Sequence, residues 1–232
     1  MKFKVFADVF DNATIAAINK LANDGYIDRM YGVIKTGKEA NVFYGIDAFG
    51  NEIAIKIYRI ETSDYKNMWL YIKGDHRFDY VKMRKKDIVI AWAKKEFKNM
   101  QEAAKAGLRV PIPYAVRRNV LVMEFIGKEG IAAPKVKDLP PSDPKRWFET
   151  LKRWIKDLYH KAELVHADLN EYNILNYDDN PVLIDWGQAV HRSHPQSLQL
   201  LRRDVHHLLR FFKGLGIEDR EEVLFKWVCN KQ

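Results

Sequence analysis

The sequence contains a single cysteine, Cys229, among its 232 residues. One cysteine cannot form an internal disulfide, and it excludes a zinc site built from a cluster of cysteines. So low a cysteine content is typical of proteins from a reducing compartment. We therefore expect a cytoplasmic protein.

Long apolar runs are missing as well. No stretch of about 18 consecutive apolar residues occurs, so we expect no membrane span and no membrane partner. The N-terminal segment carries Asp8 and Asp11 and lacks a long apolar core, which argues against a signal peptide. Internal repeats and low-complexity tracts are also absent.

The composition is that of a globular protein. Hydrophobic residues make up 47% of the chain and aromatic residues 12%, so a sizeable core can be buried. The length suits one compact domain of two lobes or two small domains. The formal net charge of +8 favours an anionic partner such as a nucleotide, RNA or an acidic surface. Many proteins are equally basic without a specific partner, so the charge alone leaves this open.

The first part of the chain predicts one helix followed by strands. Asp11 is a candidate N-cap, and Gly25 ends the apolar pattern that follows it. β-Branched and aromatic runs over residues 32–60, interrupted at Gly37 and at 48–51, predict consecutive antiparallel strands.

Residues 61–86 mix charged and aromatic residues without a clean period, so we predict a long, partly mobile connection. A helix is predicted over 87–107. Two further strands are predicted over 110–116 and 119–127.

The second half predicts mainly helices. Asp143 and Pro144 suit the N-cap and first turn of a helix. Two short apolar strands and two C-terminal helices follow. We therefore predict an α+β fold of two lobes, with a β-rich N-terminal lobe that contains one long helix (1–126) and an α-rich C-terminal lobe (127–232).

Two motifs of the second half indicate phosphoryl-transfer chemistry. HADLNEYNIL places Asp168 five positions before Asn173, and IDWG puts Asp185 at the end of the next strand. Phosphoryl transfer needs one carboxylate to orient or deprotonate the nucleophile, and a second carboxylate with an amide oxygen to hold Mg²⁺. The pattern matches the H-R-D-x-x-x-x-N and D-F-G elements of protein kinases, with Ala167 in place of Arg and Trp186 in place of Phe.

Lys56 lies in the apolar strand IAIKIY, where a charge requires a partner of opposite sign. It resembles the strand lysine that contacts the α- and β-phosphates in protein kinases. Glu96 is the only acid on a helical stripe of apolar residues that recur every fourth position (Ile88, Trp92, Met100 and Ala104). We therefore expect Lys56 and Glu96 to pair.

Each signal has a plainer structural alternative. The Asp and Asn of the first motif could cap and shape a turn, Lys56 could point to solvent from an edge strand, and Lys95 could neutralise Glu96. The occurrence of the motifs in this order favours the catalytic interpretation.

Two weaker signals concern the nucleotide. The turn KTGKEANVF bends at Gly37, and its backbone N–H groups with Lys38 could approach phosphates. A strand rather than a helix follows, and Glu39 replaces the Ser/Thr of a P-loop, so a P-loop NTPase is disfavoured. Glu124 and Ile126 are candidates for the adenine contact by position only, because an ordinary buried strand would have the same sequence.

These segments together resemble the RIO kinases, and most closely the first, Rio-one branch. The resemblance rests, in order, on TGKEANVF, IAIKIYR, WAKKEFKNM, VMEFIG, HADLNEYNIL, IDWGQAV and HPQSLQLLRRDVHHLLRFF. It extends from Asp11 to Phe212, and its most specific parts are GKEANV and HADLNEYNIL.

The resemblance implies a minimal protein-kinase lobe pair and an atypical serine/threonine kinase or ATPase that uses ATP and Mg²⁺, with Mn²⁺ as an alternative ion. It implies that Lys56 is the strand lysine and Glu96 its helix partner. Asp168 would be the catalytic residue, and Asn173 and Asp185 the metal ligands, with a transient phosphoaspartate on Asp185. The implied partner is a precursor of the small ribosomal subunit, through rRNA or ribosomal proteins.

The sequence departs from kinase patterns at three places. IDWG retains Gly187 where the branch commonly has other small residues. Asn170 replaces the lysine that follows the catalytic Asp in serine/threonine kinases, so phosphate charge must be met elsewhere, with Lys38 as a candidate. The stretch after Gly187 contains no A-P-E segment, which weakens the expectation that peptides are the substrate.

Two other functions remain open at this point. Aminoglycoside and choline phosphotransferases also use H-x-D-x-x-x-x-N and an IDW strand, but usually devote long helical segments to the acceptor. A non-catalytic, nucleotide-binding RNA adaptor is the third hypothesis. RNA could contact the basic, aromatic stretch within 61–86, or Arg202, Arg203, Arg210 and Lys213, although either could be ordinary solvated surface. The oligomeric state is left open.

Overall fold

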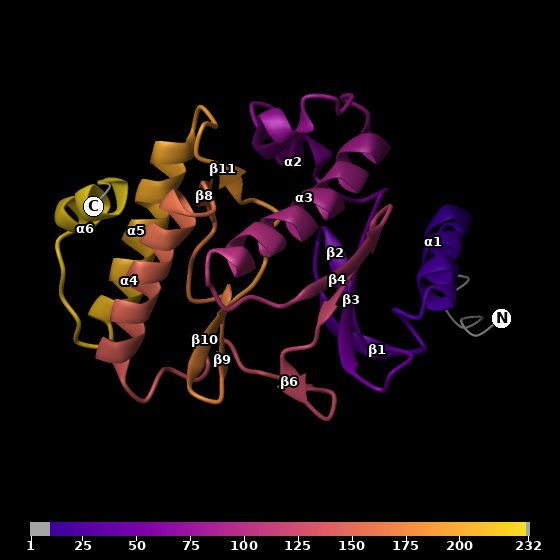
Figure 1. The fold of residues 1–232 in the computed structure, drawn as a ribbon, viewed down its shortest axis with the longest axis horizontal. Coiled ribbons are helices and arrows are strands. Elements are labelled where there is room, and N and C mark those ends of the chain that lie inside the picture. Colours follow the sequence, from indigo (N-terminus) through magenta and orange to yellow (C-terminus); the bar gives the residue numbers. More distant parts are fainter. Residues whose placement is uncertain (1–9, 231–232) are drawn as a thin grey trace.

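The computed structural model describes residues 10–230 of the chain. It has a strand-rich half and a helix-rich half, with one long helix between them (Figure 1). This arrangement confirms the predicted two-lobed α+β fold. The predicted lobe boundary between residues 126 and 127 stays a prediction.

The strand-rich half is built on a five-stranded antiparallel sheet in the order β1-β2-β3-β5-β4. Its strands are β1 (Arg29–Thr36), β2 (Ala40–Ile46), β3 (Glu52–Tyr58), β4 (Pro113–Arg117) and β5 (Val120–Glu124). They coincide with the β-branched and aromatic runs that predicted strands. β3 is the central strand, and every residue after its first is buried.

The two faces of β3 have different neighbours. Ile53 and Ile57 belong to a core cluster with residues of α1 (Asn12–Asn23). Successive side chains of a strand point to opposite faces, so Lys56 faces away from α1. On that side lies α3 (Lys85–Lys105), the long helix between the two halves (Figure 1).

Residues 61–86 differ from the prediction of a partly mobile connection. They form α2 (Tyr65–Ile72) and the short 3₁₀ helix η2 (His76–Phe78). Met68, Ile72 and Phe78 are at most 1% exposed, and all three belong to a core cluster with residues of α3. The prediction missed these helices because three buried residues among many charged ones are too few to show the periodicity of a helix. The RNA contact considered for this stretch stays a prediction.

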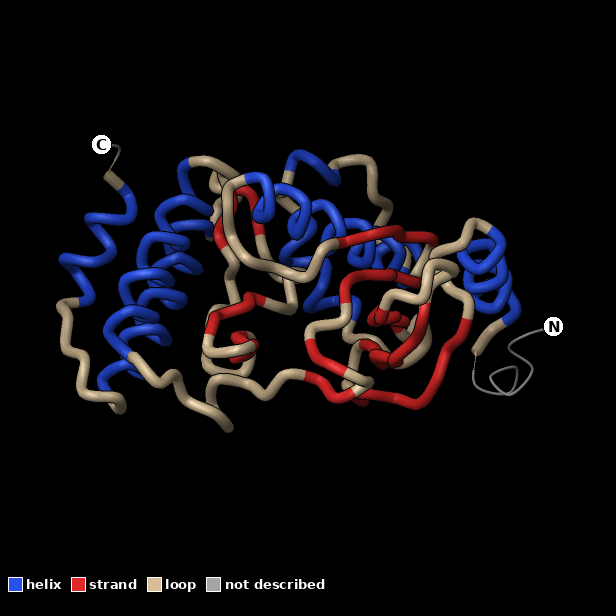
Figure 2. The backbone as a smooth tube through the Cα atoms, turned by 60° about the horizontal axis from the view of Figure 1, so that its bottom comes forward, coloured by secondary structure: helices blue, strands red, loops and turns tan. Residues whose placement is uncertain are grey.

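The helix-rich half contains three helices and three small two-stranded sheets. The helices are α4 (Pro144–His160), α5 (Ser197–Lys213) and α6 (Glu221–Cys229). The short strands are β6 (Gly127–Lys128), β7 (Ile131–Ala132), β8 (Leu164–Val165), β9 (Ile174–Tyr177), β10 (Asn180–Leu183) and β11 (Val190–His191). Figure 2 shows these helices gathered on one side of the molecule and the strands of the large sheet on the other.

Both predicted helix caps are confirmed. Asp11 accepts a hydrogen bond from the backbone N–H of Thr14 at 2.6 Å, and Asp143 accepts one from Arg146 at 3.0 Å. These bonds satisfy N–H groups that have no partner within the first turn of a helix. Between residues 10 and 230, none of the helices is both long enough and apolar enough to traverse a bilayer.

Candidate active site

A cleft of about 530 Å³ lies where the large sheet, α3 and the segment after β10 meet. Six residues that the sequence singled out line it together: Lys38, Lys56, Glu96, Glu124, Ile126 and Asp185. They come from positions far apart in the chain, so the fold brings together most of the predicted site. Asp168 and Asn173 lie outside the lining of this cleft.

Lys56 is the centre of a charge cluster in which Glu96 is buried and Asp185 is 38% exposed. Its Nζ lies 2.8 Å from Glu96 Oε1 and 2.7 Å from Asp185 Oδ1. The side chains of Lys56 and Glu96 are 10% and 1% exposed. The pairing expected from the stripe on the long helix is therefore confirmed, and Asp185 is a second partner that joins β3, α3 and the segment after β10.

The charges of this cluster support one another. Burial favours the neutral amine of Lys56, but Asp185 and Glu96 outweigh it and raise the pKa of Lys56. Lys56 in turn holds the pKa of Asp185 well below its usual range, against the effect of burial. Lys56 thus remains a cation and Asp185 an anion at neutral pH.

Lys35 is a cation of the site that the sequence reasoning missed. Its Nζ lies 3.7 Å from Asp185 Oδ2, and its side chain is 48% exposed. It precedes Gly37 at the same turn as Lys38, and both lysines line the cleft. The sequence showed a basic turn, but which lysine reaches Asp185 depends on the backbone path through that turn.

Asp168 is held in place by amides. Asn173 Nδ2 donates to Asp168 Oδ2 at 2.8 Å, and Asn170 Nδ2 donates to Asp168 Oδ1 at 3.1 Å. Gln188 Nε2 lies 3.4 Å from Asp168 Oδ2. Burial raises the pKa of Asp168, and the charge of Asp185 adds to the effect. This carboxylate is therefore a stronger base than an ordinary aspartate.

The backbone on both sides of Asp168 is fixed by Asp204 of α5. Asp204 is 1% exposed, and it accepts hydrogen bonds from the N–H groups of Ala167 at 2.7 Å and Leu169 at 2.9 Å. Sequence reasoning missed it. The stripe argument that found Glu96 would have found it, because Asp204 lies one turn from the buried Leu200 and Leu208.

The adenine contact predicted for Glu124 and Ile126 stays a prediction. The carboxylate of Glu124 is bound by the Arg109 guanidinium at 2.6 and 2.7 Å, and its backbone N–H donates to Ile112. The carbonyl of Ile126 accepts from the N–H of Ala133 at 2.9 Å. The side chain of Glu124 is therefore occupied within the protein, and a nucleotide would have to use backbone groups here.

The donor atoms suit a hard cation. Asp185 offers an ionised carboxylate, and Asn173, whose amide nitrogen donates to Asp168, carries an amide oxygen of the kind that binds such a cation. Within residues 10–230 there is no group of three or more His, Cys, Asp or Glu side chains arranged to hold a metal. Two protein oxygens completed by phosphate and water are what Mg²⁺ uses beside nucleotides.

The arginines of the second basic region considered for RNA contact other groups of the protein. Arg203 donates to the carbonyl of Ala167, Arg202 pairs with Glu222 at 2.7 Å, and Arg210 lies 3.4 Å from Glu171. These arginines have partners within the protein. The RNA contact considered for Arg202, Arg203, Arg210 and Lys213 stays a prediction.

Comparisons with known proteins agree on one family. A model of the RIO domain matches residues 41–224. The chain is 44% identical to the RIO-type serine/threonine-protein kinase Rio1 of Haloferax volcanii, with 100% of this chain and 79% of that protein covered. It is 38% identical to Rio1 of Methanocaldococcus jannaschii, with 99% and 78% covered.

The fold is also that of a solved kinase structure. The Rio2 kinase–ADP/Mg²⁺–phosphoaspartate complex of Chaetomium thermophilum superposes with a TM-score of 0.69 at 23% identity, over 92% of this chain and 66% of that one. At this identity the likeness shows the fold alone. It confirms that the two-lobed architecture is kinase-like.

Proposed function

Since this chain belongs to the RIO family of kinase-like phosphotransferases, we propose that its cleft binds ATP with Mg²⁺ and that the protein transfers or releases the γ-phosphate. The observation that carries the proposal is the Lys56–Glu96–Asp185 cluster. Phosphoryl transfer in kinases requires a strand lysine paired with a helix glutamate, beside an aspartate that binds Mg²⁺. All three groups meet in this cleft.

Each polar group has a distinct proposed role. Lys56, fixed by Glu96, binds the α- and β-phosphates. Asp185 and Asn173 hold Mg²⁺, which neutralises charge on the triphosphate. Lys35 and Lys38 contribute positive charge at the phosphate end of the cleft.

Asp168 is the proposed catalytic base. Its raised pKa suits proton acceptance from a serine or threonine hydroxyl or from water. The hydrogen bonds from Asn170 and Asn173 fix the direction of its carboxylate. In the ATPase version, a carboxylate oxygen of Asp185 displaces ADP from the γ-phosphorus, and water then cleaves the phosphoaspartate to aspartate and phosphate.

The proposed partner is a precursor of the small ribosomal subunit, met in the cytoplasm. The family resemblance suggests this partner, and the net charge of +8 supports binding to a polyanion.

The test is to follow radiolabelled γ-phosphate from ATP with Mg²⁺, with and without purified small-subunit precursor. Free phosphate that rises with the precursor, with little labelled acceptor, indicates an ATPase. Stoichiometric transfer of label to another protein indicates a protein kinase. An absence of turnover in both arms would contradict the proposal and favour the RNA adaptor or the small-molecule kinase.

A further inference from the structure

Two buried polar residues of α3 contact the chain immediately after Asp185. Lys95 and Asn99 are both 0% exposed and lie about one turn apart. Lys95 Nζ donates to the carbonyl oxygen of Gly187 at 3.0 Å and to that of Ala189. Asn99 Nδ2 donates to the carbonyls of Trp186 and Ala189, both at 2.9 Å. Residues 186–189, the 186–189 loop, thus lie against α3 through four hydrogen bonds.

A close contact reinforces these bonds. A Cβ atom on Gly187 would lie 2.5 Å from Nε1 of Trp92, which is also on α3. Only glycine therefore allows the loop to approach the helix this closely. This explains the glycine of IDWG, which the sequence alone left as a departure from the family pattern.

The 186–189 loop reaches both carboxylates of the proposed chemistry. Asp185, immediately before the loop, has a φ of +69°, a left-handed conformation that is uncommon for residues other than glycine, although Asp adopts it more readily than most. Gln188, within the loop, lies 3.4 Å from Asp168. A shift of this loop would move Asp185 away from Lys56 and Gln188 away from Asp168.

Burying the ammonium group of Lys95 costs free energy that a purely structural contact would not require. A fully buried ammonium loses its hydration, and burial lowers the pKa of Lys95 to about 7 although Asp75 opposes the effect. Well-packed apolar side chains often stabilise a core as well as buried charges do. An ammonium and an amide, however, can hold chosen backbone carbonyls in one geometry.

We propose that Lys95 and Asn99 are positioning residues that fix the 186–189 loop on α3 and thereby hold Asp185 on Lys56. Glu96 lies between them in sequence and contacts Lys56 directly, so one helix orients both partners of the Asp185–Lys56 pair. The inference rests on the proposed function for its catalytic consequence. The order of the loop itself does not depend on that function.

The test compares Lys95→Met and Asn99→Leu with a matched control, Asn119→Leu. Asn119 is 2% exposed and its Nδ2 also makes two hydrogen bonds, to Tyr58 O at 2.8 Å and Thr14 Oγ1 at 3.0 Å. The control removes a buried amide that does not bind the 186–189 loop. Melting temperature, amide hydrogen exchange of residues 185–190, and the kcat and KM for ATP as a function of Mg²⁺ are measured for all four proteins.

We expect all three variants to lose thermal stability. Only in Lys95→Met and Asn99→Leu should the amides of 185–190 exchange faster with solvent. These two variants should also have a kcat lower by roughly 10- to 100-fold and require more Mg²⁺, because losing groups that support a metal site has effects of this size. The control should keep its kcat within about twofold of the wild type, because the bonds it removes do not hold this loop. If Lys95→Met does not fold, Asn99→Leu carries the test.

Loop exchange and Mg²⁺ dependence that match the control would overturn the proposal. If the wild-type protein does not turn over ATP, the proposed function fails, and the exchange data still decide the loop contact. If the amides of 185–190 then exchange faster in Lys95→Met and Asn99→Leu only, the loop contact is supported. If they exchange equally fast in Asn119→Leu, the loop contact is refuted.

Discussion

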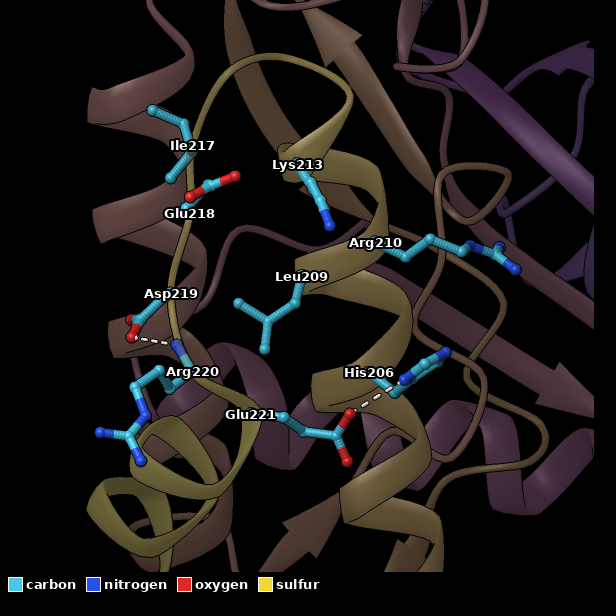
Figure 3. Close-up of a pocket in the computed structure, with 9 residues that line it drawn as sticks. All are labelled: His206, Leu209, Arg210, Lys213, Ile217, Glu218, Asp219, Arg220 and Glu221. Atoms are coloured by element: carbon cyan, nitrogen blue, oxygen red, sulfur yellow. Dashed lines mark hydrogen bonds and ion pairs between the residues drawn. The ribbon is translucent and has the colours of Figure 1, made fainter.

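Two of the hollows on this molecule are nearly equal in size, and they differ in how deeply their charged side chains are buried. The cleft beside β3 has a volume of about 530 Å³, and the hollow between α5 and residues 217–221 about 510 Å³. In the cleft, Lys56 and Glu96 are buried and held by bonds of 2.7 to 2.8 Å. In the other hollow, His206 and Glu221 lie 2.9 Å apart, a contact drawn in Figure 3, and their side chains are 58% and 37% exposed.

This difference shows that volume alone does not identify a site. Solvent-exposed ion pairs contribute about 0 to 1 kcal/mol to folding stability, so the pairs of the α5 hollow can form or break with little effect on it. Buried charges cost several kcal/mol each to desolvate and persist only when a precise arrangement or a function requires them. The cleft combines such buried charges with Lys35 and Lys38, whereas His206, Arg210 and Lys213 of the α5 hollow are exposed.

The largest expected effect is that of Asp185→Asn. This change removes the anion that pairs with Lys56 and, in the proposed mechanism, a Mg²⁺ ligand. We expect turnover to fall roughly 10³-fold, because a bound metal supplies several kcal/mol of transition-state stabilisation. The measurement is the ATP turnover rate over a range of Mg²⁺ concentrations. An unchanged dependence on Mg²⁺ would remove Asp185 from the metal site.

Asp168→Asn sharpens the distinction between binding and chemistry. We expect it to bind ATP with Mg²⁺ as the wild type does, but to lose turnover roughly 10²-fold or more, as general bases do when removed. Binding by calorimetry and turnover by phosphate release separate the two. Full turnover in this variant would contradict the role of Asp168.

His166, whose Nε2 lies 3.2 Å from the carbonyl oxygen of Ile184, tests whether the chain just before Asp185 is packed without water. The imidazole is 2% exposed, and burial lowers its pKa from 6.5 to about 4. Between these pH values the unfolded chain binds a proton that the folded protein does not, so folding stability falls as the pH drops through this window. The loss should be about 3 kcal/mol between pH 7 and pH 4.

The measurement is urea unfolding at several pH values in wild type and His166→Asn. The difference between the two slopes isolates this histidine from the other titrating groups. Identical slopes would mean that His166 is hydrated in the folded state.

Gly187→Ala tests the contact between the 186–189 loop and Trp92. The added methyl group would overlap the indole ring, so we expect a loss of about 1–3 kcal/mol in unfolding free energy. Gly32→Ala is the matched control, because a Cβ there meets no atom within 4 Å. Equal stability of the two variants would show that the loop does not need this close approach.

The smallest effect is expected in the α5 hollow. Lys213→Ala removes a cation that lines this hollow (Figure 3). We expect turnover within about twofold of the wild type and stability within about 0.5 kcal/mol, as for ordinary surface positions. A tenfold loss of turnover would break the comparison and make this hollow part of the function.

The site residues that the sequence predicted are those that belong to a helical stripe or to a motif of fixed spacing. The stripe on α3 identified Glu96, and the distance from Asp168 to Asn173 indicated a loop that carries both. Lys95 could not be found in this way, because its partners are backbone carbonyls more than ninety positions away. The sequence offered it instead as a surface partner of Glu96, and the structure buries it completely.

The same reasoning accounts for what was missed in the fold. The strands of the large sheet and the long helices have enough buried positions to show a period. α2 buries only Met68 and Ile72, too few for a pattern. The contact of Lys35 with Asp185 depends on the backbone conformation of its turn, which no pattern of side chains in the sequence predicts.

The most direct test of the central claim is calorimetric binding of a non-hydrolysable ATP analogue, with and without Mg²⁺, to wild type, Asp185→Asn and Lys213→Ala. We expect Mg²⁺ to tighten binding of the analogue by about tenfold or more in wild type and Lys213→Ala, and to have no such effect in Asp185→Asn. Equal tightening by Mg²⁺ in Asp185→Asn, or its loss in Lys213→Ala, would contradict the assignment of the nucleotide to the Lys56–Asp185 cleft.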